Sequence, residues 1–108
     1  MQTEEGKLKA RVKLYLKQLG AYWHMSVPTG LGRPTVDFVC CIPQHVNGAV
    51  VGRFVAIETK ASGKKPTANQ ALVLKEVNDA GGVGFYTDSY EGFLLTMAAK
   101  GLTPPPKK

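Results

Sequence analysis

The sequence predicts a small α/β domain with the element order helix, strand, strand, helix, strand, helix. Two apolar runs on either side of an Asn-Gly pair predict a β-hairpin. Stretches before and after the hairpin carry apolar residues at helical spacing, which predicts helices that bury one face. The chain has 108 residues, enough for one compact domain but too few for two ordinary ones. We place that domain at residues 1–101.

The first helix is expected to begin after Thr3 and to end at Gly20. Thr3 suits the N-cap, and the two glutamates that follow it suit the positive end of the helix dipole. Lysines occupy most of the surface outside one apolar face, which consists of Leu8, Val12, Tyr15, Leu16 and Leu19. Residues 21–35 then read as a short extended piece and a loop, because glycines and prolines punctuate them.

The hairpin is expected to pair Val36–Ile42 with Val50–Thr59, with residues 43–48 (PQHVNG) as its turn. Both alternating faces of the second strand are apolar. Such a strand usually lies in the middle of a sheet that helices cover.

The second half is expected to add a helix over Thr67–Ala80, a strand over Val83–Thr87 and a last helix over Tyr90–Lys100, capped by Ser89. Apolar residues of the last helix could cover either the sheet or a partner subunit: Phe93, Leu94, Met97 and Ala98. Residues 102–108 are expected to form a flexible tail.

The chain is basic, with 14 Lys and Arg against 8 Asp and Glu, a net charge of +6. This balance suits a polyanionic partner such as nucleic acid, although a merely soluble basic protein is the alternative. No apolar run approaches the ~20 residues of a membrane-spanning helix, and the polar start does not resemble an export signal. Cys40 and Cys41 are adjacent, which favours neither a disulfide between them nor a zinc site. We therefore expect a reducing, cytoplasmic location.

Charged side chains gather where the second hairpin strand ends. Glu58 and Lys60 are two residues apart, so on a strand they share a face at a separation of about 6.6 Å. Antiparallel pairing can bring Asp37 opposite them. Two carboxylates suit Mg²⁺, and a nearby ammonium can orient water and offset charge on a phosphate. The simpler alternative is an ion pair at a solvated strand end.

Flanking loops add residues suited to a DNA backbone. Those expected to contact DNA are Arg33, Lys64 and Lys65 through phosphates, Gly30 and Gly32 through close backbone approach, and His24. For His24, packing or simple surface exposure is the alternative.

These motifs together resemble the virus-type replication-repair nuclease (VRR-NUC) domain of the PD-(D/E)XK nuclease superfamily. The resemblance covers residues from about 4 to 95 and rests on Glu5, on "PTGLGRPTVDF" and on "FVAIETKASGKKPTANQ". It implies a restriction-endonuclease-like core with a central mixed sheet flanked by helices. One departure is that Pro34 and Asp37 are not adjacent, as the superfamily's Pro-Asp pair would be.

The resemblance also implies a role for each matching residue. It makes Asp37, Glu58 and the Thr59 backbone carbonyl metal ligands, Lys60 the catalytic lysine, Gln70 a glutamine beside the site, and Glu5 an acid that reaches the metal through water. Periodicity does not choose between Glu4 and Glu5; only the match of "EGK" favours Glu5.

The function implied is an endonuclease that uses Mg²⁺ or Mn²⁺, and no small-molecule cofactor, to hydrolyse DNA. Stand-alone members of the family resemble four-way-junction resolvases that act as homodimers, which implies branched DNA and a second subunit as partners. Two alternatives remain: a non-catalytic nucleic-acid-binding module of the same fold, and a monomeric flap or nicking nuclease.

Overall fold

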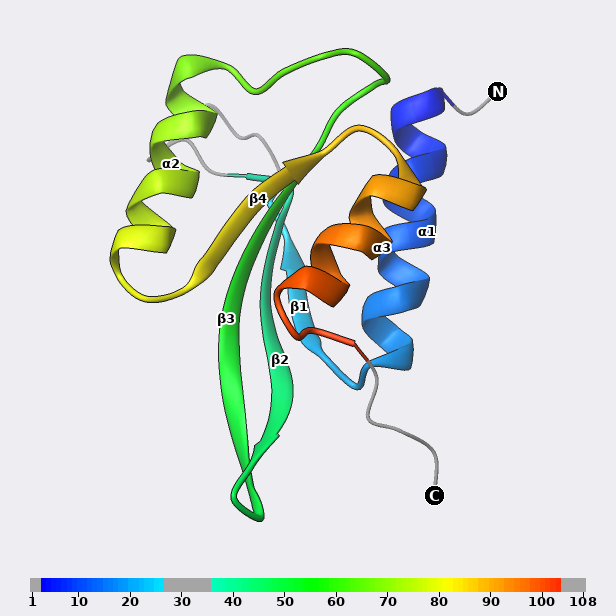
Figure 1. The fold of residues 1–108 in the computed structure, drawn as a ribbon. Helices are drawn as coiled ribbons and strands as arrows, with labels where there is room; N and C mark the ends of the chain where they lie inside the picture. Colours follow the sequence, from blue (N-terminus) through cyan, green and yellow to red (C-terminus); the bar gives the residue numbers. More distant parts are fainter. Residues whose placement is uncertain (1–2, 27–35, 104–108) are drawn as a thin grey trace.

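The computed structural model describes residues 3–26 and 36–103, which form three helices and a four-stranded sheet (Figure 1). In chain order the elements are α1 (Glu4–Gln18), β1 (Tyr22–Met25), β2 (Phe38–Val46), β3 (Ala49–Thr59), α2 (Ala68–Asp79), β4 (Val83–Thr87) and α3 (Tyr90–Ala99). The predicted α/β class is confirmed. The expected order lacked one strand, because β1 was read only as a short extended piece.

The sheet is mixed, with the strands in the order β1-β2-β3-β4. Strands β1, β2 and β3 pair antiparallel in sequence, while β4 lies parallel to β3 after the α2 crossover. β3 therefore pairs on both sides, as its two apolar faces predicted. Its end at Thr59 lies beside the end of β4 at Thr87.

The hairpin turn is shorter than expected. β2 continues through Val46, and only Asn47 and Gly48 form the turn, with φ angles of 50° and 83°. Two successive positive φ values match the right-handed twist of a two-residue hairpin. Pro43 is tolerated in β2 because β1 pairs with β2 only as far as Cys41, which leaves the rest of that edge free.

Helices α1 and α3 pack on one face of the sheet, and α2 packs on the other (Figure 1). Phe93 and Met97 of α3 are fully buried in the larger core, together with Phe38 and Ile57 of the sheet. The apolar side of α3 thus covers its own sheet. Leu102 is also buried in this core and its N–H donates to the Met97 carbonyl at 2.8 Å, so the packed domain includes a residue assigned above to the tail.

α2 lies over β3 and β4, and the sheet face beside it carries an uncovered row of side chains. The register places Tyr22 of β1 next to Cys41 of β2, and Cys41 next to Phe54 of β3. Tyr22 is 78% exposed and Phe54 49% exposed, and Cys41 is exposed between them. We call these three residues the open-face row.

Helices α1 and α3 begin after the N-caps that the sequence predicted, and α2 begins at Ala68, one residue later than predicted. The side chains of Thr3, Thr67 and Ser89 each accept a hydrogen bond from a backbone N–H in the first turn of their helix. Within residues 3–26 and 36–103, no helix is long and apolar enough to cross a membrane.

Candidate functional site

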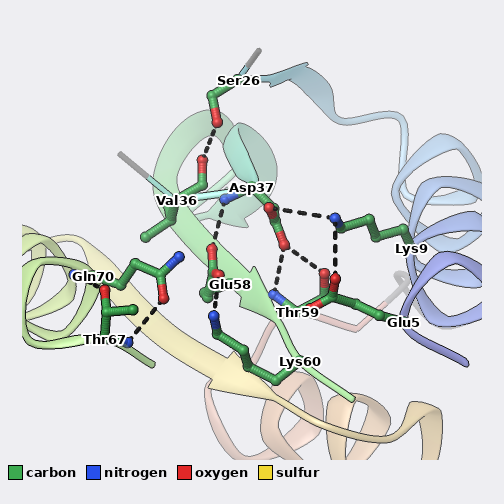
Figure 2. Close-up of polar contacts among 10 residues, drawn as sticks. All are labelled: Glu5, Lys9, Ser26, Val36, Asp37, Glu58, Thr59, Lys60, Thr67 and Gln70. Atoms are coloured by element: carbon green, nitrogen blue, oxygen red, sulfur yellow. Dashed lines mark hydrogen bonds and ion pairs between the residues drawn. The ribbon is translucent and has the colours of Figure 1, made fainter. Parts of the chain in front are cut away.

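Asp37 and Glu58 come together at the end of β3, between α1 and α2 (Figure 2). The pairing of Phe38 with Ile57 fixes this meeting, because one further step along both strands puts Asp37 opposite Glu58. The Asp37 backbone N–H donates to Glu58 Oε1 at 3.0 Å. The two predicted carboxylates are therefore brought together by the sheet itself.

The Asp37 carboxylate is fixed by its neighbour across the hairpin. Its Oδ2 accepts hydrogen bonds from the Thr59 N–H at 2.9 Å and from the Thr59 hydroxyl at 2.5 Å. Thr59 is fully buried, so these donors have no access to water. Thr59 also ends β3, and its backbone carbonyl, the expected third ligand, lies at this same end of the sheet.

Glu58 is nearly fully buried, at 2% exposure, and pairs with Lys60 at 3.2 Å between Oε2 and Nζ. Burial raises the pKa of the Glu58 carboxyl, and the Asp37 charge raises it further. Lys60 and the Asp37 N–H act in the opposite direction without cancelling the shift. A buried acid beside another acid is a site where added positive charge is favourable.

A second lysine, Lys9 of α1, lies on the other side of Asp37. Its Nζ is 3.7 Å from Asp37 Oδ1 and 3.6 Å from Glu5 Oε2 (Figure 2). From the sequence, Lys9 is expected only on the polar surface of the helix. The one signal for it was its spacing, since Lys9 follows Glu5 by four residues and so shares its side of the helix.

The structure separates Glu4 from Glu5, which periodicity could not. Glu5 connects to the carboxylate pair through Lys9. Glu4 accepts a hydrogen bond from the Ser62 N–H and thereby holds the loop that follows β3. Asp88 holds the same loop from the opposite side, because its Oδ2 accepts from the Gly63 N–H at 2.9 Å. Neither of these loop contacts was expected from the sequence.

An open cavity of about 410 Å³ reaches Lys60, the lysine paired with Glu58. It is lined by the start of α1 and by the loop after β3: Thr3, Glu4, Glu5, Lys60, Ala61, Lys64 and Lys65. Lys64 and Lys65 are exposed, as expected for lysines that contact phosphates. The cavity thus places three of the chain's lysines within one hollow next to Glu58.

Gln70 lies in the first turn of α2 and takes part in a capping box. Its Oε1 accepts from the Thr67 N–H at 3.0 Å, while its own N–H donates to the Thr67 hydroxyl. Figure 2 shows its amide nitrogen turned toward Glu58, although no hydrogen bond joins Gln70 to the carboxylates among the described residues. The expected position beside the site is therefore met, with the side chain engaged in capping.

The expected DNA contacts are only partly within the described structure. His24 is exposed on β1, paired with Val39. Gly30, Gly32 and Arg33 lie outside the described residues. The described residues on either side of them lie beside the site: the Ser26 N–H donates to the Asp37 carbonyl at 3.1 Å, and the Ser26 hydroxyl donates to the Val36 carbonyl.

The donors at this site fit a hard divalent cation of the Mg²⁺ type. Among residues 3–26 and 36–103, Asp37 Oδ1 and Glu58 Oε2 accept no hydrogen bond from the backbone, and each faces a lysine ammonium. Among the described residues, no three His, Cys, Asp or Glu side chains are grouped closely enough to hold a metal ion. An ion bound here would therefore complete its shell with water, the Thr59 carbonyl and phosphate oxygens, as Mg²⁺ commonly does.

A search of the sequence against models of known protein families found no match, and a search of curated proteins found none either.

Proposed function

We propose that the protein is a Mg²⁺- or Mn²⁺-dependent endonuclease that hydrolyses DNA phosphodiester bonds. The observation that supports this most directly is the convergence of Asp37, Glu58 and Lys60 at one end of the sheet. An ion pair alone would not require two adjacent carboxylates, one of them a buried Glu58 whose pKa is raised by that burial.

The hydrolysis needs a water that attacks phosphorus and a sugar oxygen that leaves as the phosphorus–oxygen bond breaks. When bound, the divalent ion would polarise the phosphate and lower the pKa of the attacking water. Lys60, held at 3.2 Å from Glu58, would orient that water and offset negative charge on the phosphate in the transition state. Asp37 and Glu58 would hold the ion through the oxygens that face away from the backbone.

The substrate is proposed to enter by the cavity beside Glu58. Lys64 and Lys65 line it and are free to approach successive phosphates of a strand whose scissile bond reaches Lys60. The net charge of +6 favours the same polyanionic substrate.

We further propose branched DNA as the preferred substrate and a homodimer as the active form, both resting on the family resemblance. A single chain supplies one site of this type, whereas paired cuts in a two-fold junction need two. Because Phe93 and Met97 of α3 are buried against its own sheet, a dimer would not use that side of the helix. A cytoplasmic location is part of the proposal, in keeping with two free cysteines.

A cleavage assay with the purified protein tests this function. Its substrates are a four-way junction, a flap, a splayed arm and plain duplex, each with EDTA, Mg²⁺, Mn²⁺ or Ca²⁺. We expect cleavage with Mg²⁺ or Mn²⁺, little cleavage with Ca²⁺ and none in EDTA. Calcium supports little cleavage because its looser coordination places ligands poorly for in-line attack.

The same assay separates the alternatives. Rapid cleavage in excess EDTA would contradict the proposed chemistry. Tight DNA binding without cleavage under any metal would favour the binding module instead. The mass in solution distinguishes the third alternative. If the protein cleaves flaps and its mass is that of one chain, with or without junction DNA, a paired-site resolvase is excluded and a monomeric flap nuclease is favoured.

A further inference from the structure

In each carboxylate of the site, one oxygen accepts hydrogen bonds from across the hairpin and the other faces a lysine. Asp37 uses Oδ2 to accept two hydrogen bonds from Thr59, while its Oδ1 faces the Lys9 ammonium. Glu58 uses Oε1 to accept from the Asp37 N–H, while its Oε2 faces the Lys60 ammonium. One oxygen of each acid therefore holds the strands together, and the other is covered by a lysine.

The two lysines differ in how firmly they are held. The Lys60 side chain is 16% exposed, and its partner Glu58 is buried. The Lys9 side chain is 28% exposed and lies almost equally far from two acids, 3.7 Å from Asp37 and 3.6 Å from Glu5. Lys9 can therefore leave Asp37 and keep Glu5 as a partner, so the ammonium stays paired when a cation takes its place on Asp37.

We propose that Lys9 is an internal counter-cation of the site, which occupies the free oxygen of Asp37 and competes there with the divalent ion. Binding of the ion would displace the Lys9 ammonium toward Glu5. This inference rests on the proposed function and assigns a regulatory, positioning role to Lys9 and Glu5. It gives Glu5 a task that does not require it to contact the metal.

The competition has a measurable consequence for metal affinity. In the native protein the ion must replace a favourable Lys9–Asp37 pair, and it also approaches a nearby positive charge. Removal of the Lys9 charge removes both obstacles. For a partly exposed pair we expect the affinity for Mn²⁺ to rise by roughly three- to tenfold.

The experiment measures Mn²⁺ binding to the full chain without DNA, by calorimetry or by the loss of the free-ion electron paramagnetic resonance signal. The variant is Lys9→Met, which keeps the length of the side chain. Lys13→Met is the matched control, since Lys13 is one turn further along α1 and forms no ion pair within the described part of the chain. Lys9→Arg keeps the charge. We expect tighter binding for Lys9→Met only, with near-native values for Lys9→Arg and Lys13→Met.

A second readout uses the unfolding temperature in EDTA and in saturating Mn²⁺. Lys9→Met should lose stability without metal, because Asp37 then lacks its counter-charge, and should gain more than the native protein when Mn²⁺ is added. Equal, finite Mn²⁺ affinities for native protein, Lys9→Met and Lys13→Met would overturn the role of Lys9 and leave the nuclease proposal standing. No Mn²⁺ binding by any of the four proteins would overturn both.

Discussion

Replacement of Asp37 by alanine should destabilise the fold even when no metal is present. The substitution removes the acceptor of two hydrogen bonds from Thr59, the N–H at 2.9 Å and the hydroxyl at 2.5 Å. Thr59 is fully buried in the native fold, whereas the Asp37 side chain is 22% exposed, so the cost depends on how far water enters the space that the carboxylate leaves. Each buried donor left unpaired costs roughly 1–3 kcal/mol, so the two donors together give a loss of about 2–6 kcal/mol.

Asp37→Asn separates this structural role from the charge. The asparagine keeps a side-chain oxygen that can accept from Thr59, so we expect a loss of no more than about 1 kcal/mol in the free energy of unfolding. Both variants should lose cleavage, because neither offers a carboxylate to the ion.

The assay is urea unfolding followed by circular dichroism in EDTA, with the unfolding temperature as a second measure. At about 4 °C per kcal/mol for a domain of this size, the alanine variant should unfold some 8–24 °C below the native protein. Asp79→Ala is the control, since that carboxylate is 63% exposed and, within the described part of the chain, its ion pair is with Lys75 on the same helix. Its removal should cost less than about 0.5 kcal/mol. An Asp37→Ala protein that unfolds at the native midpoint would refute the reasoning.

Three further predictions concern the neighbouring groups. Lys60→Ala should bind DNA with native affinity but cleave at least ~100-fold more slowly, because the ammonium acts on the transition state; a native single-turnover rate would contradict this. The double variant with Lys64→Ala and Lys65→Ala should instead bind DNA more weakly. The negative slope of log affinity against log salt concentration should become shallower by about 1–2, and an unchanged slope would place the phosphate contacts elsewhere. The pKa of Glu58 is raised in the folded state, so its ionisation lowers the stability of the metal-free protein as pH rises from 4.5 through that raised value. The difference in stability between the native protein and Glu58→Gln should therefore change over this range and stay constant above it. A difference that does not depend on pH would count against the buried charge.

The elements with strong local patterns could be predicted closely from the sequence. Val83–Thr87 is a strand with the predicted ends, and α2 lies within one residue of the predicted Thr67–Ala80 at each end. The strand β1 could not be recognised, because its four residues gain their strand geometry only from pairing with β2. The turn was predicted too long for a similar reason. Pro43 is compatible with a strand only where the strand edge beside it is unpaired, and the pairing of that edge depends on where β1 stops.

For the site, strand spacing and register were enough to bring Asp37, Glu58 and Lys60 together. What they could not supply is contact between α1 and the sheet. Lys9 reaches Asp37, and Glu4 reaches the Ser62 N–H, only because of the angle at which α1 packs. That angle depends on the shapes of side chains in the core, which no periodicity in the sequence encodes.

The open-face row has a practical consequence for measurements of mass in solution. Tyr22 and Phe54 expose aromatic surface to water, and a net charge of +6 keeps copies of the chain apart through repulsion. Salt shortens the range of that repulsion, to about 10 Å at 0.1 M and less above, while sulfate also strengthens apolar association. High salt, which releases bound DNA, will therefore favour contact between these aromatic surfaces, and a subunit count taken there will overstate the count at physiological ionic strength. Masses recorded over a series of chloride concentrations distinguish a specific dimer, whose mass stays at two chains, from association that grows with salt.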